Sequence, residues 1–135
     1  MIKEIKNGSE VMAIVIPHDF KEPGVHFVTP EDYSQQLAYM NHKKGKLIEP
    51  HYHKTNRRDV HRTLETLIIK NGRIRVDFYD DAQRYVECVE LVSGDVILLV
   101  QGGHGFEILE DIDMIEIKQG PFVGVEDKVR FKPVE

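Results

Sequence analysis

The chain has 135 residues, a formal net charge of −5 and 30% charged residues, which is the size and balance of one soluble domain. The acidic balance argues against a nucleic-acid partner, because phosphate contacts need a basic face. We expect no membrane association and a cytoplasmic location, because no apolar run could cross a bilayer and no signal-peptide pattern begins the chain. The single cysteine, Cys88, excludes an intrachain disulfide.

Short apolar segments recur along the chain, separated by Gly, Pro, Asn and Asp, and this pattern is typical of a β-sandwich or barrel. Asn71-Gly72 lies between two such segments and predicts a tight type I′ hairpin turn. A single helical turn is expected around 30–33. In chain order, the expected strands are 11–16, 34–41, 46–53, 64–70, 73–79, 85–91, 96–100, 105–109, 113–118 and 122–125.

Two histidines, His51 and His53, stand two residues apart in one of these expected strands. Residues at this spacing share a strand face, so both imidazoles can approach one metal ion. Gly45 comes before His51 with five residues between them. Eleven residues separate His53 from Glu65, and six more separate Glu65 from Gly72.

This order resembles the first motif of the cupin family, which runs glycine, H-x-H, glutamate, glycine. The family has three or four residues between the second histidine and the glutamate, whereas this chain has eleven. The extra residues are interpreted as a lengthened loop, which costs little additional closure entropy. A second cupin motif is recognisable in Gly94-Asp95, the apolar run 96–100 and His104, although the usual proline is missing and the histidine comes one residue early.

The resemblance implies an all-β fold, a double-stranded β-helix (cupin or jelly-roll barrel), in a single domain over 1–135. The barrel core would cover about 37–117, with an N-terminal strand and a C-terminal arm outside it. The resemblance also implies one divalent transition metal ion, Fe, Mn, Ni or Zn, with coordination positions left open for substrate. The implied ligands are His51, His53, Glu65 and His104.

His61 offers a second interpretation of the site. It lies four residues before Glu65 and would share its strand face, so the two could act as a catalytic acid–base pair. The spacing from His61 to Glu65 also fits the short gap of the family. On that alternative, Asp59 and His61 would replace the two histidines of the first motif.

Substrate contacts are expected from two places. Arg57 and Arg58 lie in the most basic stretch of the chain and would suit a phosphate or carboxylate group. Tyr39 and Asn41 share a strand face and could point into the barrel. Further candidates are polar residues on otherwise apolar strands, namely Gln36, Glu107, Glu116 and Lys118.

The resemblance implies an enzyme of isomerase, epimerase or oxygenase type, acting on a small polar molecule such as a nucleotide sugar or an organic acid in a carbohydrate pathway. Two alternatives remain: a non-catalytic module that binds a small ligand or a metal, and a structural homodimer with a vestigial site. We expect a homodimer, with the apolar run 11–16 as a candidate edge strand or exchanged N-terminal strand for pairing.

Overall fold

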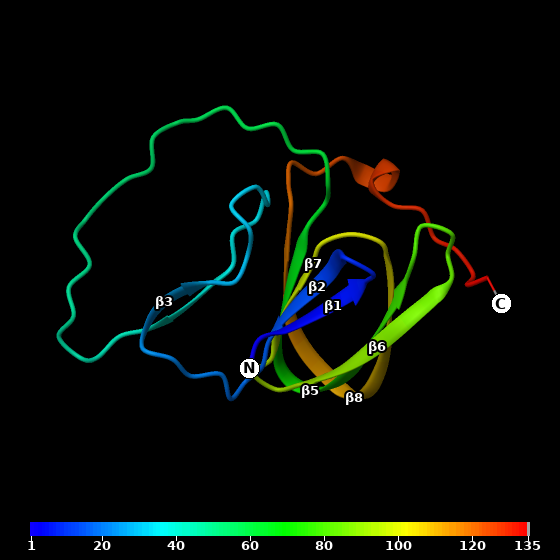
Figure 1. The fold of residues 1–135 in the computed structure, drawn as a ribbon, viewed down its shortest axis with the longest axis horizontal. Coiled ribbons are helices and arrows are strands. Elements are labelled where there is room, and N and C mark those ends of the chain that lie inside the picture. The colour runs from blue at the N-terminus through cyan, green and yellow to red at the C-terminus, as the bar shows by residue number, and fades with distance from the viewer. Residues whose placement is uncertain (135) are drawn as a thin grey trace.

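The structure is a computed structural model that describes residues 1–134, and almost all of its regular structure is β (Figure 1). The all-β prediction is therefore confirmed. Among these residues, no helix has the length and apolar character needed to cross a membrane. The elements are β1 (Lys3–Asn7), β2 (Glu10–Ile16), β3 (Gly24–Phe27), β4 (Ala38–Asn41), β5 (Glu65–Tyr79), β6 (Tyr85–Val92), β7 (Val96–Leu99), β8 (Gly103–Lys118) and the 3-10 turn η1 (Gly124–Asp127).

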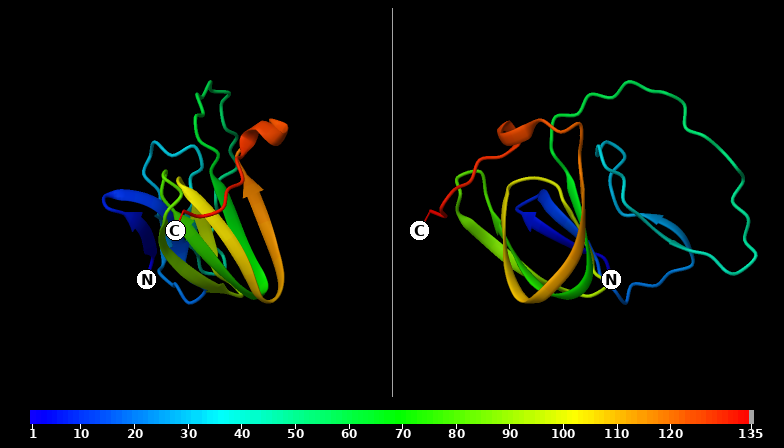
Figure 2. Two further views of the ribbon diagram at one scale, coloured as in Figure 1. Left: turned by 90° about the vertical axis from the view of Figure 1, so that its right-hand side faces the viewer. Right: turned by 180° about the vertical axis from the view of Figure 1, so that it is seen from behind.

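Six strands form one antiparallel sheet in the order β1-β2-β7-β5-β6, and β8 pairs along β5. This sheet curls into a half-barrel, which Figure 1 shows in outline and Figure 2 from two further sides. Strands β3 and β4 form a separate two-stranded sheet beside the half-barrel. The start of β5 lies between β7 and β8, whereas its end lies between β6 and β8.

The curl depends on a bend in β5, where the sequence predicted a hairpin turn. That prediction is wrong, because β5 continues through Asn71-Gly72 and the pairing with β8 shifts register on both sides of Asn71. Gly72 has a φ of 95°, and a Cβ at this position would meet the backbone of Asp111 in β8. A glycine that allows positive φ and close backbone approach is the usual residue at such a bulge.

The core lies on the concave face of the half-barrel. The predicted alternation of 73–79 is confirmed, since Ile74, Val76 and Phe78 are all buried on this face. Most of the run 11–16 is also buried, and its strand β2 lies between β1 and β7. The run is therefore not a free edge, because Ala13 to Ile16 are paired with β7 and the run also pairs with β1. Pairing of two copies by exchange of this strand stays a prediction.

Residues 42–63, here called the arm, contain no strand or helix, and every one of them is exposed. The strand predicted over 46–53 is therefore not formed. The Gln35 side-chain amide donates to the Leu64 carbonyl at 3.0 Å, and the Thr66 hydroxyl donates to Gln35 Oε1 at 2.9 Å. These bonds tie Gln35, in the segment before β4, to the start of β5, while the middle of the arm reaches away from the half-barrel (Figure 1).

Replacing Gly72 with alanine tests the bend in β5. We expect Gly72→Ala to lower the free energy of unfolding by more than about 1 kcal/mol, because the new Cβ combines positive φ with a backbone clash. Gly45→Ala is the matched control, since Gly45 also has positive φ but nothing lies near its Cβ position. Urea denaturation would measure both, and equal losses in the two variants would contradict the bulge as the critical feature.

Candidate functional site

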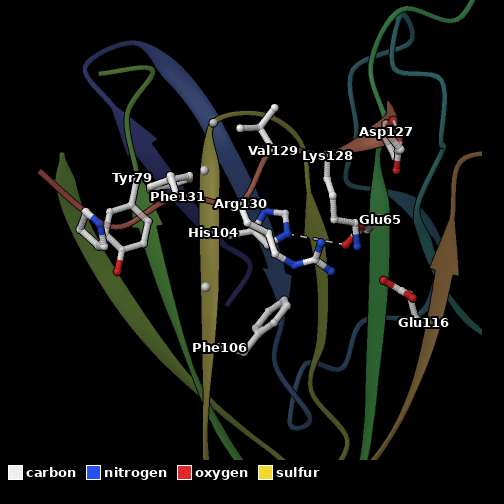
Figure 3. A pocket seen from close by; sticks show the side chains of 15 residues that line it. Glu65, Tyr79, His104, Phe106, Glu116, Asp127, Lys128, Val129, Arg130 and Phe131 are labelled. Carbon is white, nitrogen blue, oxygen red and sulfur yellow. Dashed lines mark hydrogen bonds and ion pairs between the residues drawn. The ribbon is translucent and has the colours of Figure 1, made fainter. Parts of the chain in front are cut away.

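A pocket of about 680 Å³ opens at one end of the half-barrel. Its walls are the two ends of β5, both ends of β8 and the C-terminal segment 127–133 (Figure 3). Phe106 and Tyr79 give it an apolar side, whereas Glu65, His104 and Glu116 give it a polar side. A concave site of this size with a few convergent polar groups is typical of small-molecule binding.

Strand register explains why these polar residues meet. Glu116 pairs with Leu67, and His104 pairs with Phe78. Leu67 and Phe78 belong to the buried core, and directly opposed residues on antiparallel strands project to the same side of the sheet. Glu65 lies two residues before Leu67 and therefore shares the concave face. The two ends of β8 thus bring Glu116 and His104 to the face that carries Glu65.

Glu65 and His104 form the central contact of the pocket. His104 Nε2 lies 3.7 Å from Glu65 Oε2, and the two side chains are 31% and 12% exposed, respectively (Figure 3). Partial burial is the main cause that raises the pKa of Glu65; Glu116 raises it further and Lys118 opposes the shift. Burial also lowers the pKa of His104, with Lys128 adding to the shift and Glu116 opposing it. The two pKa values therefore approach each other, which favours proton exchange between the groups.

Two contacts attach η1 to the entrance of the pocket. Lys118 Nζ lies 2.6 Å from Asp127 Oδ2, and the Thr63 hydroxyl donates to Asp127 Oδ1 at 2.6 Å. The ion pair raises the pKa of Lys118, and the hydrogen bonds to Asp127 lower the pKa of its carboxyl group. Asp127 is thus tied both to the last residue of β8 and to the last residue of the arm.

The C-terminal segment after η1 is docked on the half-barrel. Phe131 packs edge-on against Tyr79 with ring centroids 5.5 Å apart, and Val134 N–H donates to the Gln83 carbonyl. This docking places Lys128 and Arg130 at the entrance of the pocket, near His104 and Glu65 (Figure 3). From the sequence alone, the C-terminal segment could equally have been docked on the domain or a loose tail. Residue 135 lies outside the described residues.

The structure brings together two of the four predicted metal ligands, Glu65 and His104. His51 and His53 lie on the exposed arm, where their rings are 5.4 Å apart and His51 Nδ1 contacts the Glu49 carbonyl. The arm also carries His61, proposed as the acid–base partner of Glu65, which is exposed and does not line the pocket.

The four predicted substrate contacts also lie outside the pocket lining. Arg57 and Arg58 are exposed on the arm. Tyr39 lies in β4, with its ring 4.8 Å from the ring of Phe20, and Asn41 donates to the Tyr39 hydroxyl. These residues belong to the part of the molecule that stands beside the half-barrel.

The pocket supplies donors of the right chemistry for a transition metal, but too few of them. A carboxylate and a neutral imidazole are both suitable ligands, and the lowered pKa keeps His104 neutral near pH 7. Within residues 1–134, however, no group of three or more His, Cys, Asp or Glu side chains is placed to hold a metal ion. Catalytic zinc sites usually have three protein ligands, so the residues as arranged in one chain do not complete a metal centre.

The chain matches no known protein family, no curated protein and no solved structure. The site must therefore be judged from its own geometry.

Some pocket residues had a signal in the sequence and others had none. Glu116 and Lys118 were candidates because they are charged residues on an apolar strand, and both now lie beside Glu65. Lys128 and Arg130 had no such signal, because their position depends on where η1 and the following segment dock. That placement follows from the ion pair between Lys118 and Asp127 and from the packing of Phe131 on Tyr79.

The titration of His104 tests the electrostatics of the pocket. We expect its NMR titration midpoint to lie below the ordinary histidine value of about 6.5. Lys128→Ala should raise this midpoint, because it removes a positive charge that disfavours the imidazolium. Glu116→Gln should lower it, because it removes a carboxylate that favours the imidazolium. Shifts of the same sign in the two variants would contradict the proposed arrangement of charges.

Proposed function

We propose that the half-barrel is a cupin-like double-stranded β-helix and that its open end is an enzyme active site for a small anionic molecule. The observation that carries this proposal is the convergence of Glu65 and His104 in the pocket, with pKa values shifted towards each other. Titratable groups that meet from distant parts of the sequence, with pKa values perturbed in this way, are typical of functional sites.

The charge at the entrance supports an anionic substrate. Lys128 and Arg130 line the pocket on the side of the C-terminal segment. Lys118 does not line the pocket and is already paired with Asp127. An arginine matches the geometry of a carboxylate or phosphate, so a sugar phosphate, a nucleotide sugar or an organic acid is the class of ligand that we propose.

The chemistry available to Glu65 and His104 is proton transfer. The lowered pKa favours the neutral His104 imidazole, which can accept a proton from the substrate, and the raised pKa of Glu65 lets its carboxylate take that proton from the imidazolium and return it to the substrate. Such a pair suits an isomerase or epimerase, which removes and replaces a proton on a polar substrate. The side chain of Phe106 and the aromatic pair Tyr79–Phe131 would limit access of water to the reacting atoms.

A divalent transition metal ion is the second part of the proposal. Glu65 and His104 would be two of its ligands. The remaining ligands would have to be groups other than the His, Cys, Asp and Glu side chains that residues 1–134 of one chain bring together in the pocket. Such an ion would supply Lewis-acid polarisation of a substrate oxygen.

Metal content tests this proposal. Supplied with Mn²⁺, Fe²⁺, Ni²⁺ or Zn²⁺, the full chain should retain about one ion per protein chain, and both Glu65→Gln and His104→Ala should weaken binding at least about tenfold. His26→Ala is the matched control, because His26 is an exposed histidine of β3 whose ring contacts the Pro23 carbonyl. Elemental analysis and calorimetry would measure retention and affinity.

Two results would count against the metal. One is a wild-type chain that retains no ion after supply. The other is a His104→Ala chain that binds as tightly as the His26→Ala control.

A further inference from the structure

We propose that residues 127–131, here called the strap, are a movable cover that gives the pocket its affinity for anions, so that an anionic ligand binds only while both ends of the strap are docked. The inference deepens the proposed function and rests on it for the charge of the ligand. Three features of the structure carry it, namely the charge of the pocket, the two docking points of the strap, and the exposed residues between them.

The half-barrel alone gives the pocket an acidic wall. Within residues 1–134, the acidic and basic residues that its strands contribute to the lining are Glu65 of β5, Glu116 of β8 and His104. Neither carboxylate forms an ion pair with a lysine or arginine of these residues, and the lowered pKa of His104 favours its neutral imidazole. An anion placed against this wall would meet two carboxylates and no fixed positive charge, which disfavours its binding.

The strap reverses the sign of this charge. It adds Lys128 and Arg130 to the lining, and Figure 3 shows both at the entrance of the pocket. Its one acidic residue, Asp127, is neutralised by the ion pair with Lys118. The docked strap therefore contributes two cations to the pocket and no uncompensated negative charge.

Each end of the strap is docked by a different kind of contact. At the first end, Asp127 Oδ2 lies 2.6 Å from Lys118 Nζ. At the last end, the ring of Phe131 packs on Tyr79, and a Cβ at Gly103 would lie 2.8 Å from the same ring. The lack of a side chain at Gly103 therefore makes room for Phe131.

The residues between these docking points have no comparable support. All three are exposed, whereas Asp127 and Phe131 are partly buried. Within residues 1–134, the backbone of 129–133 forms no hydrogen bond to other backbone groups. Segments with few buried contacts and few backbone hydrogen bonds open at a low free energy, without unfolding of the core. The strap can therefore leave the pocket while the half-barrel stays folded.

Docking of the strap and binding of an anion are coupled as a result. An anion in the pocket is attracted by Lys128 and Arg130 only in the docked state, because an undocked strap takes both cations away. The apparent dissociation constant of the anion therefore rises as the docked fraction falls. By reciprocity, a bound anion stabilises the docked strap.

Inorganic phosphate is the probe for the anion site. In an NMR titration of the full chain at constant ionic strength, phosphate should cause saturable shifts of the amide signals of His104 and Phe106. Lys128→Ala/Arg130→Ala should raise the dissociation constant at least about tenfold, because it removes both charge-assisted contacts. An unchanged constant in this double variant would overturn the proposal.

Variants of the docking points distinguish docking from charge. Phe131→Ala changes no charge, yet it should raise the phosphate dissociation constant at least about threefold, because the docked fraction falls. Asp127→Asn removes a negative charge beside the pocket, so charge alone predicts tighter binding, whereas loss of docking predicts weaker binding. The matched controls are Phe122→Ala and Glu126→Gln, since both residues are exposed and lie outside the pocket lining, and they should bind phosphate like the wild type. Unchanged binding in Phe131→Ala, or tighter binding in Asp127→Asn, would overturn the proposal.

A spin label reports the position of the strap without any ligand. The label is attached to Val129→Cys, a site that is 83% exposed, in a Cys88→Ser background that removes the natural thiol. It should broaden the amide signals of Tyr79 and His104, and Phe131→Ala should weaken this broadening. Phosphate should restore part of the broadening in that variant, because anion binding stabilises docking. Equal broadening with and without Phe131→Ala would overturn the movable strap.

The two measurements separate this inference from the proposed function. A wild-type chain that binds no phosphate, with broadening that depends on Phe131, would overturn the anionic ligand of the proposed function while the docked strap stands. Phosphate binding that is equal in the wild type and in both docking variants would leave the anionic ligand standing and overturn the role of the strap.

Discussion

The antiparallel pairing of β5 with β8 holds the candidate site together. It joins Glu65 to Lys118 at one end of β5 and Phe78 to His104 near the other. Because β5 bends at Gly72, the two ends of the pair curl towards each other, and a carboxylate and an imidazole from distant parts of the sequence come within 3.7 Å. The burial that shifts the pKa values of Glu65 and His104 follows from this curvature.

The sequence was informative where one strand faces the core. The alternation of Ile74, Val76 and Phe78 identified a buried face, and the motif spacing identified Glu65 and His104 as functional candidates. It misled at Asn71-Gly72, because a glycine with positive φ serves a hairpin turn and a strand bulge equally well. Only the partner strand, which passes close to Gly72, distinguishes the two.

The rest of the site depends on tertiary placement that no local pattern encodes. Lys128 and Arg130 reach the pocket because Asp127 binds Lys118 and Phe131 packs on Tyr79. His51 and His53 have the spacing of metal ligands, yet the structure places both on the exposed arm, because spacing along the chain does not fix where a long loop lies.

Paramagnetic broadening by Mn²⁺ tests the central claim most directly, because it locates a bound ion among assigned amide signals of the full-length protein. A substoichiometric addition should broaden the signals of Glu65, His104 and Glu116 at a lower Mn²⁺ concentration than those of residues elsewhere in the chain. This response would place the ion at the open end of the half-barrel. Broadening confined to the arm, or to exposed acidic residues of β8 such as Glu107 and Glu110, would contradict the account.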